Sequence, residues 1–379
     1  MSPVPDGRAF PRARRVVVKI GSSTLMGEGP CLDEAFIADL TSQIDRLMRE
    51  GVQVVLVSSG AIAAGLAPLG FSSRPHEVDV LQACAAVGQV ELIQTYARTF
   101  AREGLHVGQV LLTRNDTGSR SAYLHARLTM ERLLELGCVP VVNENDTVAV
   151  DEIKFGDNDS LAAIVGALIG ADLVVLMSDI EGLYTADPHS DPSATLVSRV
   201  ERVDEGIMGL ASGSSSTVGT GGMMTKVRAA RATQLAGSEM VICLGRRPNV
   251  LYDVAMGEDI GTRFVPDRSH SPEPARKLWI GFAGHDCGSV VIDEGARAAL
   301  HSGGGSLLPV GVTHVSGTFS RGDIIAVKDA DGALIARGIT AYSSQEAELT
   351  RGMKLDMVGR VVPSLAGVAL IHRDELLVF

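Results

Sequence analysis

Two carboxylates, an amide and a lysine lie close together in the segment Lys154–Ser160, which reads Lys-Phe-Gly-Asp-Asn-Asp-Ser. The apolar run that starts near Leu161 predicts a helix directly after it, and either Asp159 or Ser160 can cap that helix, Ser160 being the better candidate. A helix start offers free N–H groups and positive partial charge to an anion. The pattern predicts a corner that binds a small charged ligand, or alternatively a polar turn with an N-cap.

Two lysines in other segments, Lys19 and Lys226, are candidates for binding an anion. Lys19 is near the end of the apolar run Arg15–Ile20, so its ammonium group must reach solvent or pair with an anion such as phosphate. Lys226 follows the glycine-rich segment Gly219–Thr225, whose backbone N–H groups and threonine hydroxyls are the parts of a phosphate cradle. The spacing differs from G-x-x-x-x-G-K-[ST], so a P-loop is not supported and a flexible loop is the alternative.

The first 245 residues alternate short apolar runs with longer helix-like stretches. Runs that are apolar on both faces are typical of a parallel sheet covered by helices on each side. The expected strands are Arg15–Ile20, Gln53–Val57, Val107–Leu112, Val139–Val142, Leu173–Met177 and Met240–Leu244. The expected helices include Asp33–Glu50, Ser121–Leu136 and Lys226–Ala236, each long enough for a right-handed crossover. The sequence therefore predicts an α/β fold, an αβα sandwich with a mainly parallel central sheet.

Polar loops follow four of these strands. They are Gly21–Ser23, Ser58–Ala61, Asn143–Asp146 and Ser178–Gly182. Parallel strands end at one edge of a sheet, and functional groups gather beyond their carboxyl ends. We therefore expect the four loops to lie together and to form a binding site.

Length, composition and net charge limit which classes of protein the chain can belong to. The 379 residues exceed what one hydrophobic core usually serves, which favours two domains. Hydrophobic residues make up 45% and charged residues 21%, as in folded soluble proteins, and the net charge of −11 opposes non-specific binding to nucleic acid or acidic membranes.

Cysteine usage and the N-terminal residues favour a cytoplasmic, soluble protein. The one membrane-like run, Leu161–Met177, divides better into a buried helix and a buried strand, so no contact with a membrane is expected. The five cysteines lie far apart without a C-x-x-C pair, so neither a zinc site nor a disulfide framework is indicated. Residues 1–13 combine arginines with prolines and no apolar stretch, which predicts a loose leader rather than a secretory signal.

Six sequence blocks, taken together and in order, resemble the bacterial glutamate 5-kinases of the amino acid kinase superfamily. They are Val18–Ser22, Val57–Gly65, Val142–Asp146, Lys154–Asp159, Gly182–Pro188 and Gly219–Lys226. The resemblance extends from about Arg14 to Arg263. It implies ATP-dependent phosphorylation of the side-chain carboxylate of L-glutamate to L-glutamyl 5-phosphate, with Mg²⁺, as the first step of proline biosynthesis. Carbamate, acetylglutamate, aspartate and uridylate kinases share such a sheet and are the alternatives; the Gly156–Asp159 block favours glutamate.

The resemblance also implies site residues and partners. The catalytic residues are Lys19, Lys226 and Asp159, with Asp159 orienting the two lysines. The ATP-binding residues are Lys19, Ser178, Asp179, Thr220, Gly221, Gly222, Met223, Met224, Thr225 and Lys226. The substrate-binding residues are Ser59, Asp146 and Asn158, assisted by Asn143 and Asp157. No residue is assigned as a metal ligand, proline is the expected feedback inhibitor, and a homo-oligomer (dimer or tetramer) and a glutamyl phosphate reductase are the expected partners.

Two positions depart from the family pattern. Ser178 stands where threonine is common, and it keeps the hydroxyl. Met224 stands where serine or alanine is common, which leaves a backbone cradle but removes a side-chain hydrogen bond there.

The chain after about Lys277 has a different sequence pattern, in which short strand-like runs alternate with turns. Pro266–Pro274 is rich in proline and serine, so we expect a kinase domain over 14–265, a linker over 266–276 and a small β-barrel over 277–379. That last part resembles a PUA domain, a fold better known from RNA-modifying enzymes. From Arg276 onwards, however, 10 Lys plus Arg face 11 Asp plus Glu, a net charge of −1, so RNA binding is not expected.

Overall fold

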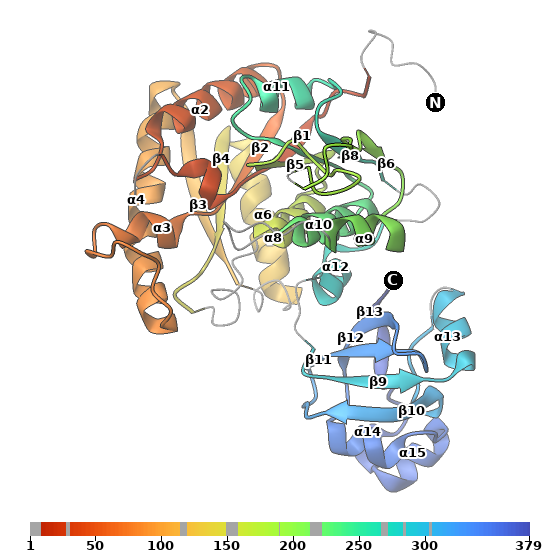
Figure 1. The fold of residues 1–379 in the computed structure, drawn as a ribbon. Coiled ribbons are helices and arrows are strands. Elements are labelled where there is room, and N and C mark those ends of the chain that lie inside the picture. Colours follow the sequence, from red (N-terminus) through yellow and green to blue (C-terminus); the bar gives the residue numbers. More distant parts are fainter. Residues whose placement is uncertain are drawn as a thin grey trace. The chain divides into compact units, whose positions relative to one another are not determined.

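The computed structural model describes residues 9–27, 31–113, 120–148, 158–188, 190–212, 222–266, 272–282, 286–302 and 305–379. Two compact units, Met1–Ala275 and Arg276–Phe379, divide the chain. Each unit has a sheet of its own, drawn in red to green for the first unit and in blue for the second (Figure 1).

An eight-stranded sheet forms the centre of the first unit. Its strands are β1 (Arg15–Ile20), β2 (Gln53–Ser58), β3 (His106–Leu112), β4 (Cys138–Glu144), β5 (Leu173–Ser178), β6 (Arg199–Val200), β7 (Glu239–Leu244) and β8 (Thr262–Phe264). They lie in the order β3-β4-β2-β1-β5-β7-β8-β6, and every pair is parallel except β7 with β8. The predicted mainly parallel sheet is confirmed, and each predicted strand is present with bounds shifted by no more than two residues.

Helices cover both faces of this sheet, as expected for an αβα sandwich. They are α1 (Ser22–Leu25), α2 (Glu34–Arg49), α3 (Ala61–Leu66), α4 (Val78–Arg102), α6 (Arg120–Glu135), α8 (Asn158–Ile169), α9 (Glu205–Ser212), α10 (Met223–Leu235) and α11 (Val250–Ala255). Helices α2 and α11 lie on one side of the strands, and α8 and α10 lie on the other (Figure 1).

The alternation of side chains along β1 shows how the two faces are divided. Val16, Val18 and Ile20 join the buried core formed with α2, α4 and α11. Because successive strand residues point to opposite faces, Val17 and Lys19 face the layer of α8 and α10 instead. The position of Lys19 in β1, after three consecutive valines, thus fixes which helices it can meet.

Two predicted helix starts are too late by three residues. α8 begins at Asn158, so Ser160 lies inside its first turn and is not its cap. α10 begins at Met223, so Lys226 is at its fourth position rather than its first. In both places polar or glycine-rich residues favour a loop locally, but packing against the sheet extends the helix over them.

The longest helix, α4, was not predicted. It packs on α3 through two glycines, with no room for a side chain at either. A Cβ on Gly65 would lie 1.9 Å from the carbonyl oxygen of Cys84, and one on Gly88 would lie 1.9 Å from that of Ala61. This close approach places α4 directly over the segment that connects β2 to α3.

A mixed five-stranded sheet forms the second unit. Its strands are β9 (Gly288–Ile292), β10 (Val312–Gly317), β11 (Ile324–Lys328), β12 (Leu334–Thr340) and β13 (Ile371–Val378), in the order β10-β9-β11-β12-β13. Its helices are α12 (Ala275–Phe282), α13 (Glu294–His301), α14 (Ser344–Thr350) and α15 (Leu355–Val361).

Helix α12 is held to the second unit's sheet by an ion pair, a hydrogen bond and an aromatic contact. Arg276 pairs with Glu375 on β13 at 2.5 Å, and Arg337 donates a hydrogen bond of 3.0 Å to the carbonyl oxygen of Gly281. The ring of Phe282 meets that of Phe379 edge to face. Over the described part of the chain, no helix is long and apolar enough to cross a membrane.

We predict that Gly88→Ala lowers the free energy of unfolding by about 2 kcal/mol, because the added methyl group would overlap the backbone of α3. Urea denaturation measures this loss.

Gly209→Ala is the matched control, since it is a helical glycine in α9 where a Cβ would meet no atom within 4 Å. It should stabilise the protein by about 0.5–1 kcal/mol. Similar changes in the two variants would contradict the close packing of α3 on α4.

Candidate functional site

Lys19 is a buried ammonium group at the carboxyl end of the central strand of the sheet. Its side chain is only 9% exposed, and β2 and β5 flank it on either side. Its Nζ lies 2.5 Å from Oδ1 of Asp159, so the anion that it meets inside the protein is a carboxylate.

Asp159 lies in the first turn of α8 and is completely buried. Its second oxygen, Oδ2, is 3.2 Å from Nζ of Lys226 and accepts a hydrogen bond of 3.2 Å from Oγ1 of Thr225. One carboxylate therefore holds two ammonium groups, which come from β1 and α10. Because these three groups carry two positive charges and one negative charge, they retain a net charge of +1 that suits an anionic ligand.

The start of α10 lies at this cluster. Gly222 is the N-cap in an extended conformation, and Met223, Met224 and Thr225 form the first turn before the buried Lys226. The same Thr225 hydroxyl lies 2.8 Å from the carbonyl oxygen of Gly222, so its single hydrogen is shared between that carbonyl and the Asp159 carboxylate. A helix starting at Lys226 was expected, with a phosphate cradle or a flexible loop before it; Gly222 to Lys226 instead form the N-cap and first turn of a helix beside the ion pairs.

Electrostatics keep Asp159 ionised. Burial raises the pKa of this carboxyl, but attraction to Lys19 and Lys226 and their hydrogen bonds outweigh it and lower the pKa to about 2. A carboxylate with such a pKa does not take up a proton near neutrality.

The residue before Asp159 belongs to a separate, uncharged network. Nδ2 of Asn158 lies 2.9 Å from the carbonyl oxygen of Ser58, 3.0 Å from Oγ of Ser59 and 2.9 Å from Oδ1 of Asn143. Ser58 and Ser59 are at the end of β2, and Asn143 is near the end of β4. The structure thus brings together three of the predicted substrate-binding residues, Ser59, Asn143 and Asn158.

Helix α4 supports this network with two side chains. Oε1 of Gln89 accepts a hydrogen bond of 2.8 Å from Nδ2 of Asn143, and the buried Tyr96 hydroxyl lies 2.9 Å from Oγ of Ser58. Gln89 and Tyr96 are seven residues apart, so they lie on the same face of the helix. Burial raises the pKa of Tyr96 well above its ordinary value, so this hydroxyl stays protonated.

Gln89 and Tyr96 were not predicted as site residues, because α4 was not predicted. A signal was present: Leu81, Cys84, Ala85, Gly88 and Leu92 recur at helical spacing and are all buried. The glycine at position 88 weakens that pattern locally, although it is what allows the helix to approach α3.

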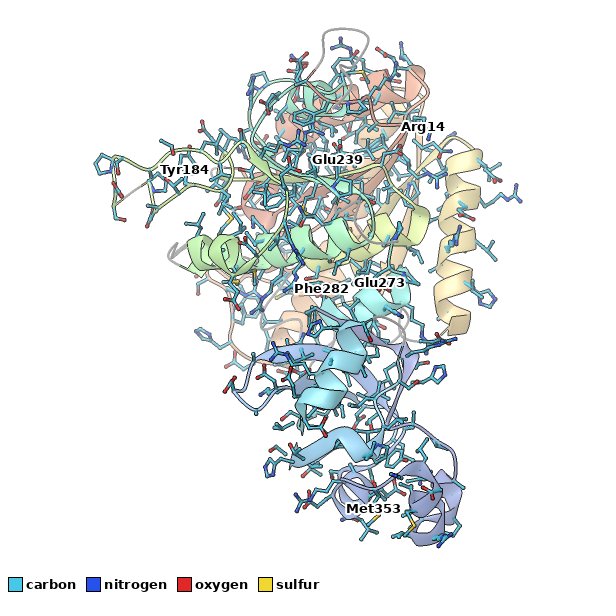
Figure 2. All side chains as sticks on the ribbon, turned by 90° about the vertical axis from the view of Figure 1, so that its right-hand side faces the viewer. Arg14, Tyr184, Glu239, Glu273, Phe282 and Met353 are labelled. Carbon is cyan, nitrogen blue, oxygen red and sulfur yellow. The ribbon has the colours of Figure 1, made fainter. Side chains whose placement is uncertain are left out.

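The remaining predicted site residues take different positions. Ser178 ends β5, is buried, and donates a hydrogen bond of 2.9 Å to the exposed Asp179. The chain then forms a hairpin bridged between Tyr184 and Leu196, which projects from the first unit (Figure 2). Asp146 is half-buried in the turn after β4. Asp157, Thr220 and Gly221 lie outside the described residues.

Within the described ranges, no three His, Cys, Asp or Glu side chains form a group that could hold a metal ion. Asp159 is a poor ligand for a cation, because both its oxygens already face ammonium groups.

We predict that Asp159→Asn lowers the free energy of unfolding by about 3 kcal/mol at pH 7, because two buried ammonium groups lose their shared counter-ion. Urea denaturation measures the loss. The folded-state pKa of about 2 is below the ordinary value of 3.8. The contribution of Asp159 is therefore complete above pH 4 and is lost as the pH falls towards 2.

Lys226→Met is the comparison, since it leaves one carboxylate paired with one ammonium group. It should destabilise the protein less than Asp159→Asn. Equal losses in the two variants would contradict a carboxylate shared between two lysines.

Comparison with known proteins agrees with the fold. The model of the amino acid kinase family matches residues 14–243, and that of the PUA domain matches 288–362. Glutamate 5-kinases from Thioalkalivibrio sulfidiphilus and Burkholderia multivorans are 47% and 46% identical, each over 96% of this chain and 97% of theirs. One from a Geobacter species is 46% identical over the same shares. The chain therefore belongs to the glutamate 5-kinases of the amino acid kinase family and carries a C-terminal PUA domain.

Proposed function

We propose that this kinase transfers the γ-phosphoryl group of ATP to the side-chain carboxylate of L-glutamate and releases L-glutamyl 5-phosphate and ADP. The observation that carries the proposal is the placement of two recognition systems on consecutive residues of one helix turn. Asp159 holds the two lysines, and Asn158 joins the uncharged network of Ser59 and Asn143.

The chemistry requires alignment and charge neutralisation rather than a general base. A carboxylate substrate is already a nucleophile at neutral pH, so its oxygen can attack the γ-phosphorus directly as the bond to the β-phosphate oxygen breaks. We assign Lys19 and Lys226 to the negative charge that develops on the transferring group. Asp159 is the organiser of both lysines, since its pKa of about 2 makes it unsuitable as a proton acceptor.

Nucleotide binding is assigned to the edge formed by the ends of β1 and β5 and the start of α10. Ser178 and Asp179 follow β5, and the N–H groups of the first turn of α10 face outwards from a helix start, where phosphate binds well. Thr220 and Gly221 complete the same assignment by sequence.

We expect Mg²⁺ to reach the site bound to ATP, with phosphate oxygens and water as its main ligands, as is common for this ion. When bound, it neutralises phosphate charge.

Glutamate recognition is assigned to Ser59, Asn143 and Asn158, which the network joins, together with Asp146 and Asp157. We further propose that the reaction is the first step of proline biosynthesis, that proline inhibits it at or near the glutamate site, and that a glutamyl phosphate reductase receives the product. Residues 14–265 would carry the catalysis, in the cytoplasm.

We also propose a homo-oligomer built through the kinase domain. Its support is the apolar surface of α6, where the side chains of Leu124 and Leu128 are 43% and 59% exposed one helical turn apart.

The reaction itself is tested by trapping the acyl phosphate. Purified protein with L-glutamate, ATP, Mg²⁺ and hydroxylamine should form glutamyl hydroxamate, which the ferric-complex colour assay detects. Aspartate, acetylglutamate and carbamate serve as competing acceptors. Hydroxamate formed from aspartate but not from glutamate would overturn the proposal.

The role of Lys226 is tested by Lys226→Ala. We expect kcat to fall by about 100-fold or more, with a smaller change in KM for glutamate, because the interaction forms mainly in the transition state. Lys354→Ala, an exposed lysine of the second unit, is the control and should leave both constants unchanged. An unchanged kcat in Lys226→Ala would remove this lysine from the mechanism.

A further inference from the structure

Two backbone groups determine which side-chain atom of Asn158 and of Asn143 is the nitrogen and which is the oxygen. The carbonyl oxygen of Ser58 can only accept a hydrogen bond, so the Asn158 atom 2.9 Å away must be the amide nitrogen. The backbone N–H of Glu144 can only donate, so the Asn143 atom 2.8 Å away must be the amide oxygen. These assignments agree, because that nitrogen and that oxygen then form the 2.9 Å bond between the two asparagines.

These bonds also determine whether the other side-chain atom of each asparagine is a donor or an acceptor: Nδ2 of Asn143 is a donor, and Oδ1 of Asn158 is an acceptor. Nδ2 of Asn143 must be a donor, and the acceptor that it meets is Oε1 of Gln89, at 2.8 Å. Nδ2 of Asn158 faces three acceptors within the protein, which engage both of its hydrogens. Its Oδ1 makes no hydrogen bond to another of the described residues, which leaves this acceptor available to a ligand.

On the basis of the proposed function, we infer that Gln89 is a positioning residue for substrate recognition, which orients Asn143 and through it Asn158. In this orientation Asn158 turns its nitrogen inwards and presents only its carbonyl oxygen. A carbonyl oxygen recognises a hydrogen-bond donor, so Asn158 selects the ammonium group of an amino acid rather than a carboxylate.

The position of Gln89 explains why a side chain outside the strand-end loops can have this role. It follows Gly88, where α4 and α3 make their closest contact, so its backbone is held by direct packing. The network has a fixed end at the Ser58 carbonyl and a fixed end at the Glu144 N–H. Gln89 is the acceptor for Asn143, and it can be removed by mutation without changing either strand.

Steady-state kinetics of Gln89→Met test the inference. Methionine keeps the length and helix propensity of glutamine but removes the acceptor, which leaves Nδ2 of Asn143 without its hydrogen bond. We expect KM for glutamate to rise about fivefold, while kcat and KM for ATP stay within about twofold.

Two further variants separate positioning from a general effect of substitution in α4. Gln94→Met makes the same change at an exposed position of the same helix and should behave like the parent protein. Gln89→Glu retains an oxygen acceptor and should keep KM for glutamate within about twofold of the parent. The inference is overturned by an equal rise of KM in Gln89→Glu, by a rise in Gln94→Met, or by a fall in kcat at unchanged KM.

Hydrogen exchange of the side-chain amides, followed by NMR, makes the test independent of the substrate. The Asn143 amide protons should exchange faster in Gln89→Met than in the parent, and at the parent's rate in Gln89→Glu and Gln94→Met. If the parent did not phosphorylate glutamate, the proposed function would fail, and exchange alone would decide the role of Gln89. Unchanged exchange in Gln89→Met would overturn it.

Discussion

The buried carboxylate of Asp159 between two ammonium groups is the interaction on which the arrangement of the first unit depends. It joins three elements that are far apart in the sequence, because Lys19 comes from β1, Asp159 from α8 and Lys226 from α10. Each charge would be costly to bury alone, so the loss of a partner weakens the packing of the strand on the two helices, most of all when the shared carboxylate is removed. The two lysines and Asp159 together carry one net positive charge at the carboxyl edge of the sheet, which suits an anionic ligand.

A second, uncharged system depends on the packing of two helices. The contact at Gly65 and Gly88 brings α4 against α3, and α4 then reaches the ends of two strands with Tyr96 and Gln89. The left-handed conformation of Gly60, with φ of 98°, turns the chain from β2 into α3 directly after Ser58 and Ser59. Backbone conformation, helix packing and amide orientation are therefore linked in this part of the site.

Much of the fold could be predicted from the sequence, because short β-branched runs that alternate with helix-length stretches indicate a parallel sheet covered by helices. The antiparallel strand β8 was missed, since its three residues carry little pattern of their own. The start of α10 was placed too late because the glycines before Met223 favour a loop, whereas its packing and the Thr225 hydrogen bonds are properties of the folded chain. Gln89 could not be assigned to the site, because its partner Asn143 is 54 residues away and only the fold brings them together.

Asn158 and Asp159 are neighbours in one turn of α8, and this has a consequence for how the enzyme could change its substrate. Under the proposed roles, the residue that holds the amino acid and the residue that holds the phosphate-binding lysines are joined by a single peptide unit of fixed length. The turn therefore fixes the distance between the group that binds the amino acid and the group that holds the lysines. An acceptor one methylene shorter, held at the same amide, would leave its carboxylate short of the lysines. Recognition of a substrate of different length would require changes in β2, β4 and α4. A shift of α8 would not suffice, because it would move Asn158 and Asp159 together.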